Sequence, residues 1–253
     1  MRIILSILLC CCSAFAGTYS TTFSGGNANP ISEGGNWING YTTGKQWSDV
    51  QITNGLCCNA QLNAGDGNSY NDGTAILSGS WGATQYVSAA IWFNASKITN
   101  GSAGAANQYR EIELRLRSSI TASNCTGYEI DFSFTTPTNV SPYIYISKWN
   151  GAFGSFTDIS GGGVHGTQYQ VQNGDVVSAS VTNSTIKAFI NGTNVLTATD
   201  STFTTGSPGV GFDMSMNYSD VVYYGYTNFY ATDFAPSPPS AVFGISTAGR
   251  ISQ

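Results

Sequence analysis

Hydrophobic and polar residues alternate in a series of short runs between positions 17 and 234, and this two-residue period is typical of β-strands with one buried face. The clearest succession lies in positions 171–212, where three short alternating runs are separated by turn residues. Asn191-Gly192 separates two of these runs, and this dipeptide favours a tight hairpin because both residues tolerate positive φ angles. Successive antiparallel strands with one apolar face require a second layer, so the sequence predicts an all-β, two-sheet antiparallel sandwich.

The predicted strands are short runs that alternate, or are rich in β-branched and aromatic residues, and are bounded by Gly, Asn, Ser or Pro. From the N-terminus they are 19–23, 56–62, 75–77, 85–93, 109–117, 128–134, 142–148, 175–181, 186–190, 195–198, 210–212 and 221–234. Positions 25–47 are predicted to be a loop. The glycine-rich stretch around His165 is predicted to be a loop at one end of the sandwich, where ligand contacts are common.

The predicted strand 109–117 carries an unusual polar face. Its apolar residues, Ile112, Leu114 and Leu116, are expected to face the core. The alternate residues share the opposite face at a spacing of about 7 Å, and they are Glu111, Glu113, Arg115 and Arg117. If the following strands are neighbours, they add to the same face Glu129, Asp131, Tyr143, Tyr145 and Trp149. Because charged residues are only 9% of the chain, this clustering marks a candidate site.

Three interpretations of this polar face follow from its residue types. It could be a solvated outer face with weak cross-strand ion pairs. It could be a concave carbohydrate-binding groove, in which Tyr143, Tyr145 and Trp149 stack on sugar rings and the charged groups bind hydroxyls. It could be a catalytic site, because Glu113 and Asp131 on neighbouring strands could provide the two carboxyls that a glycosidase holds about 5–5.5 Å or 6.5–9.5 Å apart.

The segment 171–212 also resembles a known family. It reads VQNGDVVSASVTNSTIKAFINGTNVLTATDSTFTTGSPGVGF, and it is similar to the late strands of the concanavalin A-like lectin/glucanase superfamily, including its laminin-G-like branches. In those proteins a GD pair, a strand, an NG turn, a D and a G-x-PG turn recur in this order. The resemblance implies a jelly-roll fold over 17–234. It leaves the function open, because the superfamily includes lectins, glycosidases, lyases and adhesion domains.

The glucanase branch of the superfamily carries its catalytic acids on one strand as Glu-x-Asp-x-(x)-Glu. The matching run here is Glu111-Ile112-Glu113-Leu114-Arg115, in which arginine replaces the final acid. The resemblance therefore argues against glucanase activity, because the general acid is missing at Arg115. A hydrolase or lyase that uses Glu113 and Asp131 stays an alternative.

The cysteines after position 16 are Cys57, Cys58 and Cys125. In an oxidising compartment they predict one disulfide, from Cys58 or Cys57 to Cys125, with a vicinal Cys57–Cys58 bridge as the alternative. Their spacing does not favour a zinc site, and the single histidine has no ligand partner, so no metal or cofactor is predicted. Calcium held by carboxylates such as Asp66, Asp72 or Asp213 is left open.

The two ends of the chain differ in composition from positions 17–234. Residues 1–16 combine a basic start, an apolar run and a small-x-small site, which predicts a secretory signal peptide; lipoprotein processing near Cys10–Cys12 is the alternative. Residues 235–253 begin with a proline-rich stretch and predict a linker and tail, disordered or donated to a neighbouring subunit. The apolar run at the start is too short for a permanent transmembrane segment.

The net charge of −5 and the abundant hydroxyl and amide side chains argue against nucleic acid or an anionic membrane as a partner. The sequence therefore predicts a secreted or cell-surface jelly roll that recognises a polysaccharide or a cell-surface glycan. A polysaccharide-degrading enzyme is the first alternative, and a structural surface or filament subunit that self-associates through its tail is the second.

Overall fold

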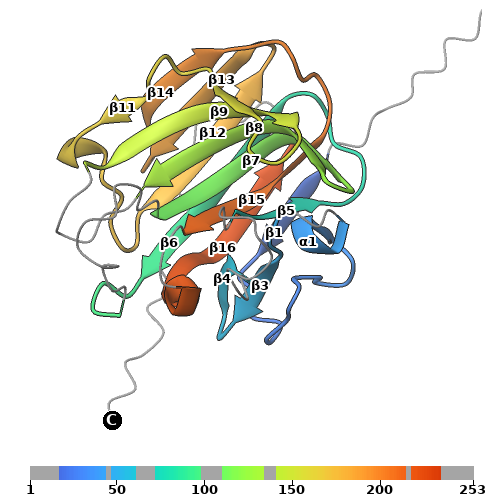
Figure 1. Ribbon diagram of the computed structural model, residues 1–253, viewed down its shortest axis with the longest axis vertical. Coiled ribbons are helices and arrows are strands. Elements are labelled where there is room, and N and C mark those ends of the chain that lie inside the picture. The colour runs from blue at the N-terminus through green and yellow to red at the C-terminus, as the bar shows by residue number, and fades with distance from the viewer. Residues whose placement is uncertain are drawn as a thin grey trace, which may run out of the picture.

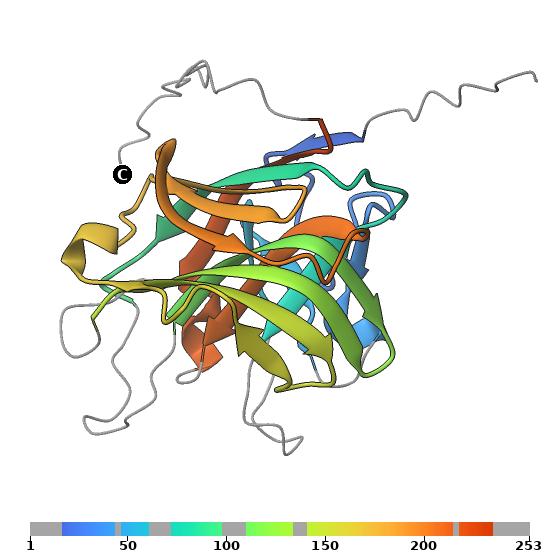
Figure 2. The same ribbon diagram turned by 90° about the horizontal axis from the view of Figure 1, so that it is seen from above.

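The computed structural model describes residues 17–43, 47–60, 72–97, 110–133, 141–214 and 218–234, which form two antiparallel β-sheets packed face to face (Figures 1 and 2). The predicted all-β, two-sheet sandwich is confirmed. Within these ranges three short helical segments accompany the strands; they are α1 (Gly40–Thr43), η2 (Thr167–Tyr169) and η3 (Tyr218–Tyr223). None of the helices in these described ranges has the length and apolar character needed to cross a membrane.

The first sheet contains eight strands: β1 (Thr18–Thr21), β3 (Val50–Thr53), β4 (Leu56–Asn59), β6 (Gln85–Phe93), β12 (Val176–Thr182), β13 (Thr185–Ile190), β14 (Thr193–Thr199) and β16 (Tyr224–Thr232). Their order is β14-β13-β12-β6-β16-β4-β3, and β1 pairs with β16. The last strand therefore returns beside the first, as the jelly-roll resemblance predicts, with Thr18 opposite Thr232.

The second sheet also contains eight strands: β2 (Trp37–Asn39), β5 (Gly73–Leu77), β7 (Arg110–Thr121), β8 (Asn124–Ser133), β9 (Tyr143–Gly151), β10 (Phe156–Asp158), β11 (Val164–His165) and β15 (Ser207–Met214). Their order is β10-β9-β8-β7-β15-β5-β2, and β11 pairs with β9. Strands β2, β3, β10 and β11, which have two to four residues each, are absent from the sequence prediction.

The hairpin predicted at Asn191-Gly192 is confirmed, since both residues have positive φ angles, 50° and 77°. An irregularity that the alternation does not predict occurs in β7. Its pairing with β8 shifts register between Leu116 and Ser119, and Arg117 in between has a φ angle of 47°. This β-bulge reverses the alternation, so that Ile120 lies with the residues of the polar face and not with the core.

The main core lies between the sheets. Ile112, Leu114 and Leu116 of β7 are fully buried in it, as predicted, and they pack with apolar residues from both sheets. Tyr226 of β16 also points into this layer, and its hydroxyl donates a hydrogen bond of 2.9 Å to the carbonyl oxygen of Glu113. One tyrosine thus joins the first sheet to the strand that carries the polar face.

A polar contact joins β9 to the loop that follows β14. The Lys148 amino group lies 2.8 Å from Asp200 Oδ2, and the Tyr128 hydroxyl donates to Asp200 Oδ1 at 2.8 Å. Burial alone would raise the pKa of Asp200, but hydrogen bonds from Lys148 and Thr202 outweigh this effect and hold that pKa well below its ordinary value.

The predicted disulfide is wrong, because Cys57, Cys58 and Cys125 are free thiols. Cys57 packs in the core between the sheets, whereas Cys125 packs in a second apolar cluster on the far face of the second sheet. Cys58 alternates with Cys57 along β4 and so points away from that core. The second sheet therefore stands between Cys125 and either partner.

Three further predictions fall on residues that the structure does not describe. The signal peptide at 1–16, the linker and tail at 235–253, and Asp66 as a calcium ligand all lie outside the described ranges.

Candidate functional site

The candidate site lies on the face of the second sheet that points away from the first. Figure 2 shows this sheet arched, with its hollow side turned away from the first sheet. Side chains of Glu113, Arg115 and Asp131 share this face, because the alternate residues of β7 and β8 fill the core. The register pairs Glu113 with Asp131 and Arg115 with Glu129 as direct neighbours.

The centre of this face is buried. Glu113 is 1% exposed, Arg115 is 0% and Asp131 is 6%. The interpretation of a solvated outer face is therefore wrong for these residues, and the expected open groove does not extend to them. Part of the cover is a second apolar cluster, formed by Trp47, Ile76, Ile120, Cys125 and Trp149.

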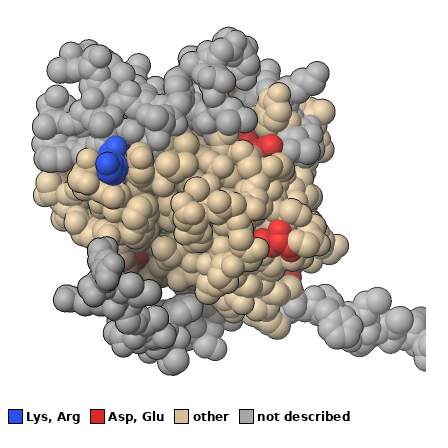
Figure 3. Space-filling view, turned by 90° about the horizontal axis from the view of Figure 1, so that it is seen from below, with Lys and Arg blue, Asp and Glu red and all other residues tan. Residues whose placement is uncertain are grey.

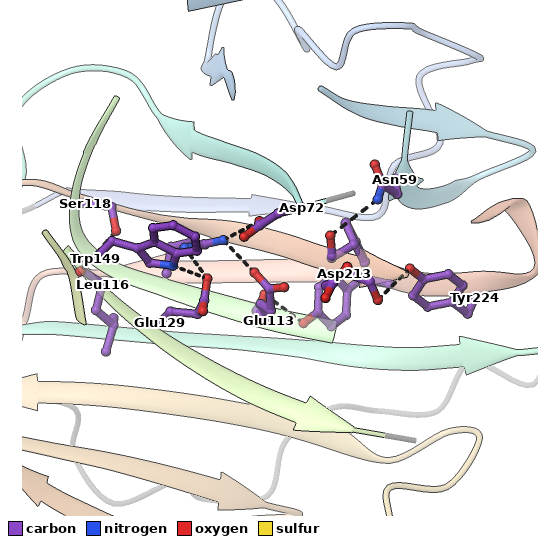
Figure 4. A network of polar contacts seen from close by, with 12 residues as sticks. Asn59, Asp72, Glu113, Leu116, Ser118, Glu129, Trp149, Asp213 and Tyr224 are labelled. Atoms are coloured by element: carbon purple, nitrogen blue, oxygen red, sulfur yellow. Dashed lines mark hydrogen bonds and ion pairs between the residues drawn. The ribbon is translucent and has the colours of Figure 1, made fainter. Parts of the chain in front are cut away.

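Arg115 lies at the centre of a buried ion cluster. Figure 4 labels the three carboxylates of the cluster, Asp72, Glu113 and Glu129. The Arg115 Nη2 lies 2.6 Å from Glu113 Oε2 and 2.9 Å from Asp72 Oδ1. Its Nη1 contacts Glu129, whose carboxylate also accepts a hydrogen bond of 2.7 Å from the indole nitrogen of Trp149. The guanidinium carbon lies 5.8 Å from the Trp149 ring centre. The arginine is thereby held by three carboxylates from different parts of the chain.

The electrostatics of this cluster combine desolvation and ion pairing. Burial raises the pKa of Asp72 and of Glu113 well above the ordinary carboxyl range, while the charge of Arg115 opposes that rise. Burial alone would lower the pKa of Arg115, but Glu129, Glu113 and Asp72 outweigh it and raise that pKa. The arginine therefore stays charged, and it cannot supply the proton that a glucanase acid supplies at this position.

The backbone allows this arrangement at Gly211 of β15. A Cβ atom at this position would lie 2.2 Å from Glu113 Oε2 and 2.9 Å from Arg115 Nε, so the two side chains lie directly over the glycine. Any larger residue would displace them from their ion pair.

A second group of carboxylates lies beside the first. Glu111, Glu113 and Asp131 each place one oxygen within 4.8 Å of the others. Asp213 of β15 is the direct cross-strand neighbour of Glu111. Burial raises the pKa of Asp131 well above its ordinary value, with Glu129 and Glu111 adding to the rise, and burial raises the pKa of Asp213 to about 7. Asp131 Oδ1 and Asp213 Oδ1 are buried and accept no hydrogen bond.

One exposed part of the face is the edge formed by β9 and β11. We call Tyr145 and His165, together with the buried Tyr143 beside them, the aromatic edge. The ring centres of Tyr145 and His165 lie 5.5 Å apart, and the tyrosine hydroxyl lies 3.1 Å from His165 Nε2. Tyr143 lies 5.2 Å from Tyr145, and its hydroxyl donates to the carboxylate of Glu111. Tyr145 and Glu111 are partly exposed, and His165 is exposed.

Two predicted ligand-binding residues, Arg117 and Trp149, have side chains occupied by contacts within the protein. The bulge turns Arg117 away from Arg115, and its guanidinium donates to the carbonyl oxygens of Ala83 and Phe203. Trp149 is 4% exposed, and its ring is surrounded by Trp47, Phe153 and Phe156. Neither residue is placed to contact a glycan in this structure.

The sequence pattern did not predict that Asp72 and His165 lie on the polar face. Asp72 follows a long polar stretch, and no periodic signal connects it to Arg115 on a distant strand. His165 was assigned to a loop because Gly161-Gly162-Gly163 precedes it. Gly163, with a φ angle of 65°, allows close approach, since a Cβ there would lie 2.4 Å from the Ile144 carbonyl oxygen and 2.8 Å from the Tyr145 ring.

Comparison with solved structures finds proteins of similar fold. An inactivated mutant of β-agarase B in complex with agaro-octaose matches at a TM-score of 0.54 and 9% identity, over 86% of this chain and 93% of that one. β-Agarase B from Zobellia galactanivorans matches at a TM-score of 0.51 and 10% identity, over 86% and 92%. The carbohydrate-binding module CBM66 from Bacillus subtilis matches at a TM-score of 0.47 and 14% identity, over 80% and 94%.

No protein-family model and no curated protein sequence matches the chain. The structural matches confirm the jelly-roll fold that the segment 171–212 predicts. At these identities they establish the fold alone.

Proposed function

We propose that this chain is a secreted carbohydrate-binding domain that recognises a glycan at the aromatic edge of its hollow sheet. The observation that carries the proposal is the pairing of Tyr145 with His165 on an exposed part of this face, beside the partly exposed residue Glu111. Secretion rests on the signal-peptide pattern of residues 1–16.

The chemistry of the aromatic edge suits a sugar. Aromatic rings offer an apolar face to the C–H groups of a pyranose, and their polar tips bind its hydroxyls. Tyr145 and His165 combine both properties, and Glu111 adds an acceptor of hydrogen bonds. Specific small-ligand sites commonly combine aromatic walls with a few polar groups in this way.

The low surface charge favours a neutral ligand. Charged residues are 9% of the chain, and the face in Figure 3 shows only isolated acidic and basic groups among uncharged ones. Recognition through a broad field of one charge, as for nucleic acid, has little support in this composition. Stacking and hydroxyl contacts remain as the source of affinity.

The proposal is tested by glycan binding to the folded protein. A glycan array and affinity electrophoresis should identify a ligand, from a panel that includes the agaro-oligosaccharides bound by β-agarase B. We then expect Tyr145→Ala and His165→Ala each to weaken binding about tenfold, or about 1.4 kcal/mol.

Tyr230→Ala is the matched control for this test. Tyr230 is a partly buried tyrosine of β16 in the opposite sheet, where it packs near Tyr86. The control should bind the glycan like the wild type. Equal binding by the Tyr145→Ala variant would place the glycan elsewhere, and no binding by the wild type to any glycan would contradict the function.

A polysaccharide-degrading enzyme is the second candidate, and one observation favours it. Glu113 and Asp131 are cross-strand neighbours with raised carboxyl pKa values, which is how a general acid is kept protonated near neutral pH. Release of reducing ends or unsaturated sugars from mixed polysaccharides, abolished in Asp131→Asn, would support this candidate. Glycan binding without any product would favour the binding function.

A further inference from the structure

We propose that Glu111, Glu113 and Asp131, together with Asp213, form a binding site for calcium on the hollow face of the second sheet. The inference does not depend on the proposed glycan function. It rests on where these four carboxylates lie and on which of their oxygens have no partner.

The spacing of the first three carboxylates suits one cation. Each of the three residues offers an oxygen that lies within 4.8 Å of the other two. Two ligands that are each about 2.4 Å from a calcium ion can lie at most about 4.8 Å from each other, and all three pairs of oxygens meet this limit. The residues come from adjacent strands β7 and β8, which fix their separation through the backbone pairing of Glu113 with Asp131.

Unpartnered oxygens provide the second observation. Asp131 is 6% exposed, and its Oδ1 accepts no hydrogen bond. Asp213 is 9% exposed, its Oδ1 is also without a partner, and it lies directly across from Glu111 in the register of β7 and β15. A buried carboxylate oxygen without a hydrogen bond costs free energy, and a bound cation would remove that cost.

A second triad of carboxylates lies nearby, but its centre is already filled by the Arg115 guanidinium. Asp72, Glu113 and Glu129 also lie within 4.8 Å of one another, but the guanidinium contacts all three, so a cation already occupies their centre. Of the proposed ligands, only Glu113 is among the carboxylates that pair with Arg115. For Glu111 the described polar contact is a hydrogen bond from the Tyr143 hydroxyl, which would orient the carboxylate from the second coordination shell.

The crowding of like charges supports the same site. Asp213 and Glu111 are direct cross-strand neighbours, so their carboxylates bring like charges together, and a bound cation would offset that repulsion. Oxygen ligands of this kind suit hard cations. Calcium fits better than magnesium, because calcium accepts six to eight oxygens in flexible geometry, whereas magnesium usually keeps several waters in near-octahedral geometry.

The experiment compares thermal unfolding of the full chain after chelator treatment, with and without calcium chloride, and measures binding by calorimetry. At a calcium concentration about 100 times the dissociation constant, we expect the unfolding midpoint to rise by about 5–10 °C. The rise should be lost in Asp131→Asn and in Glu111→Gln. It should persist in Asp158→Asn, a control at an exposed acid of β10 in the same sheet.

Three results would overturn the inference. They are the absence of a midpoint shift and of binding heat in the wild type, an undiminished shift in Asp131→Asn, and an equal response to magnesium. If the variants do not fold, terbium luminescence of the wild type decides, because Tyr143 lies next to Glu111 and can sensitise a bound lanthanide. Sensitised emission that calcium displaces would support the site, and its absence would refute it.

Discussion

Replacing Arg115 by methionine should destabilise the fold strongly. The guanidinium is 0% exposed and contacts Glu113, Asp72 and Glu129, so its removal leaves three buried carboxylates without their cation. Removing one partner of a buried ion pair costs about 3–5 kcal/mol, because the remaining charge is uncompensated. Methionine keeps a long apolar side chain, so lost packing adds little to this value.

Urea unfolding followed by tryptophan fluorescence measures this effect, since Trp149 lies against the guanidinium. With an m value of about 2–3 kcal/mol/M, the loss corresponds to a fall in the urea midpoint of about 1–2.5 M at unchanged m. The corresponding fall in melting temperature is about 6–20 °C. A midpoint within about 0.3 M of the wild type would refute the reasoning, because the cluster would then contribute no net stability.

Two companion variants separate charge from geometry. Arg115→Lys keeps the charge but loses the planar fork that contacts several carboxylates, so an intermediate midpoint is expected. Combining Arg115→Met with Glu129→Gln removes one of the uncompensated charges, and the double variant should be more stable than the sum of the two single losses predicts. Strict additivity would show that Glu129 and Arg115 are not coupled.

The remaining predictions concern other parts of the sandwich. Gly211→Ala should lower the free energy of unfolding by about 1–3 kcal/mol in urea titrations, because its Cβ would collide with the Glu113 carboxylate, whereas Gly25→Ala, with open space around it, should be neutral. Hydrogen bonds depress the pKa of folded Asp200, so this residue stabilises the fold above about pH 4, and that stabilisation is lost as the pH falls below this value. The Asp200→Asn variant should therefore show a smaller loss of unfolding free energy than the wild type below about pH 4. Because Cys57, Cys58 and Cys125 are free thiols, a reducing agent should leave the melting temperature unchanged. Because burial raises the pKa of Cys125 to about 12, iodoacetamide should alkylate this thiol only after unfolding.

The fold was predictable from sequence because its signals are local. Alternation in 109–117 assigns Ile112, Leu114 and Leu116 to the core, and Asn191-Gly192 fixes a hairpin through the conformational preference of two residues. The bulge at Arg117 could not be predicted in this way, because an arginine with a positive φ angle leaves no mark in the hydrophobic pattern.

Whether the polar face is exposed or covered depends on contacts between residues far apart in the sequence, so the local pattern does not predict it. Alternation correctly separates Glu113 from the core, but it does not show whether another layer covers the opposite face. Trp47 and Trp149, which lie about a hundred positions apart, form part of that cover, and Asp72 reaches Arg115 from a segment without periodicity. The disulfide prediction failed for the same reason, because residue type and count carry no information on which side of a sheet Cys125 lies.

Arg115, which ends the run Glu111-Ile112-Glu113-Leu114-Arg115, decides which residues of the polar face are free to bind a ligand. A glutamate there would add another carboxylate to a crowded buried cluster, and like charges at such distances raise one another's pKa values. Arg115 instead gathers Asp72, Glu113 and Glu129 into ion pairs, which fixes these side chains and removes a proton donor from the strand. Apart from Glu113, which pairs with Arg115 and also lies beside Glu111 and Asp131, the residues left for a ligand are those that the arginine does not hold. At the exposed edge they are Tyr145 and His165, which suit a sugar. In the interior they are the carboxylates whose oxygens lack partners, which suit a cation.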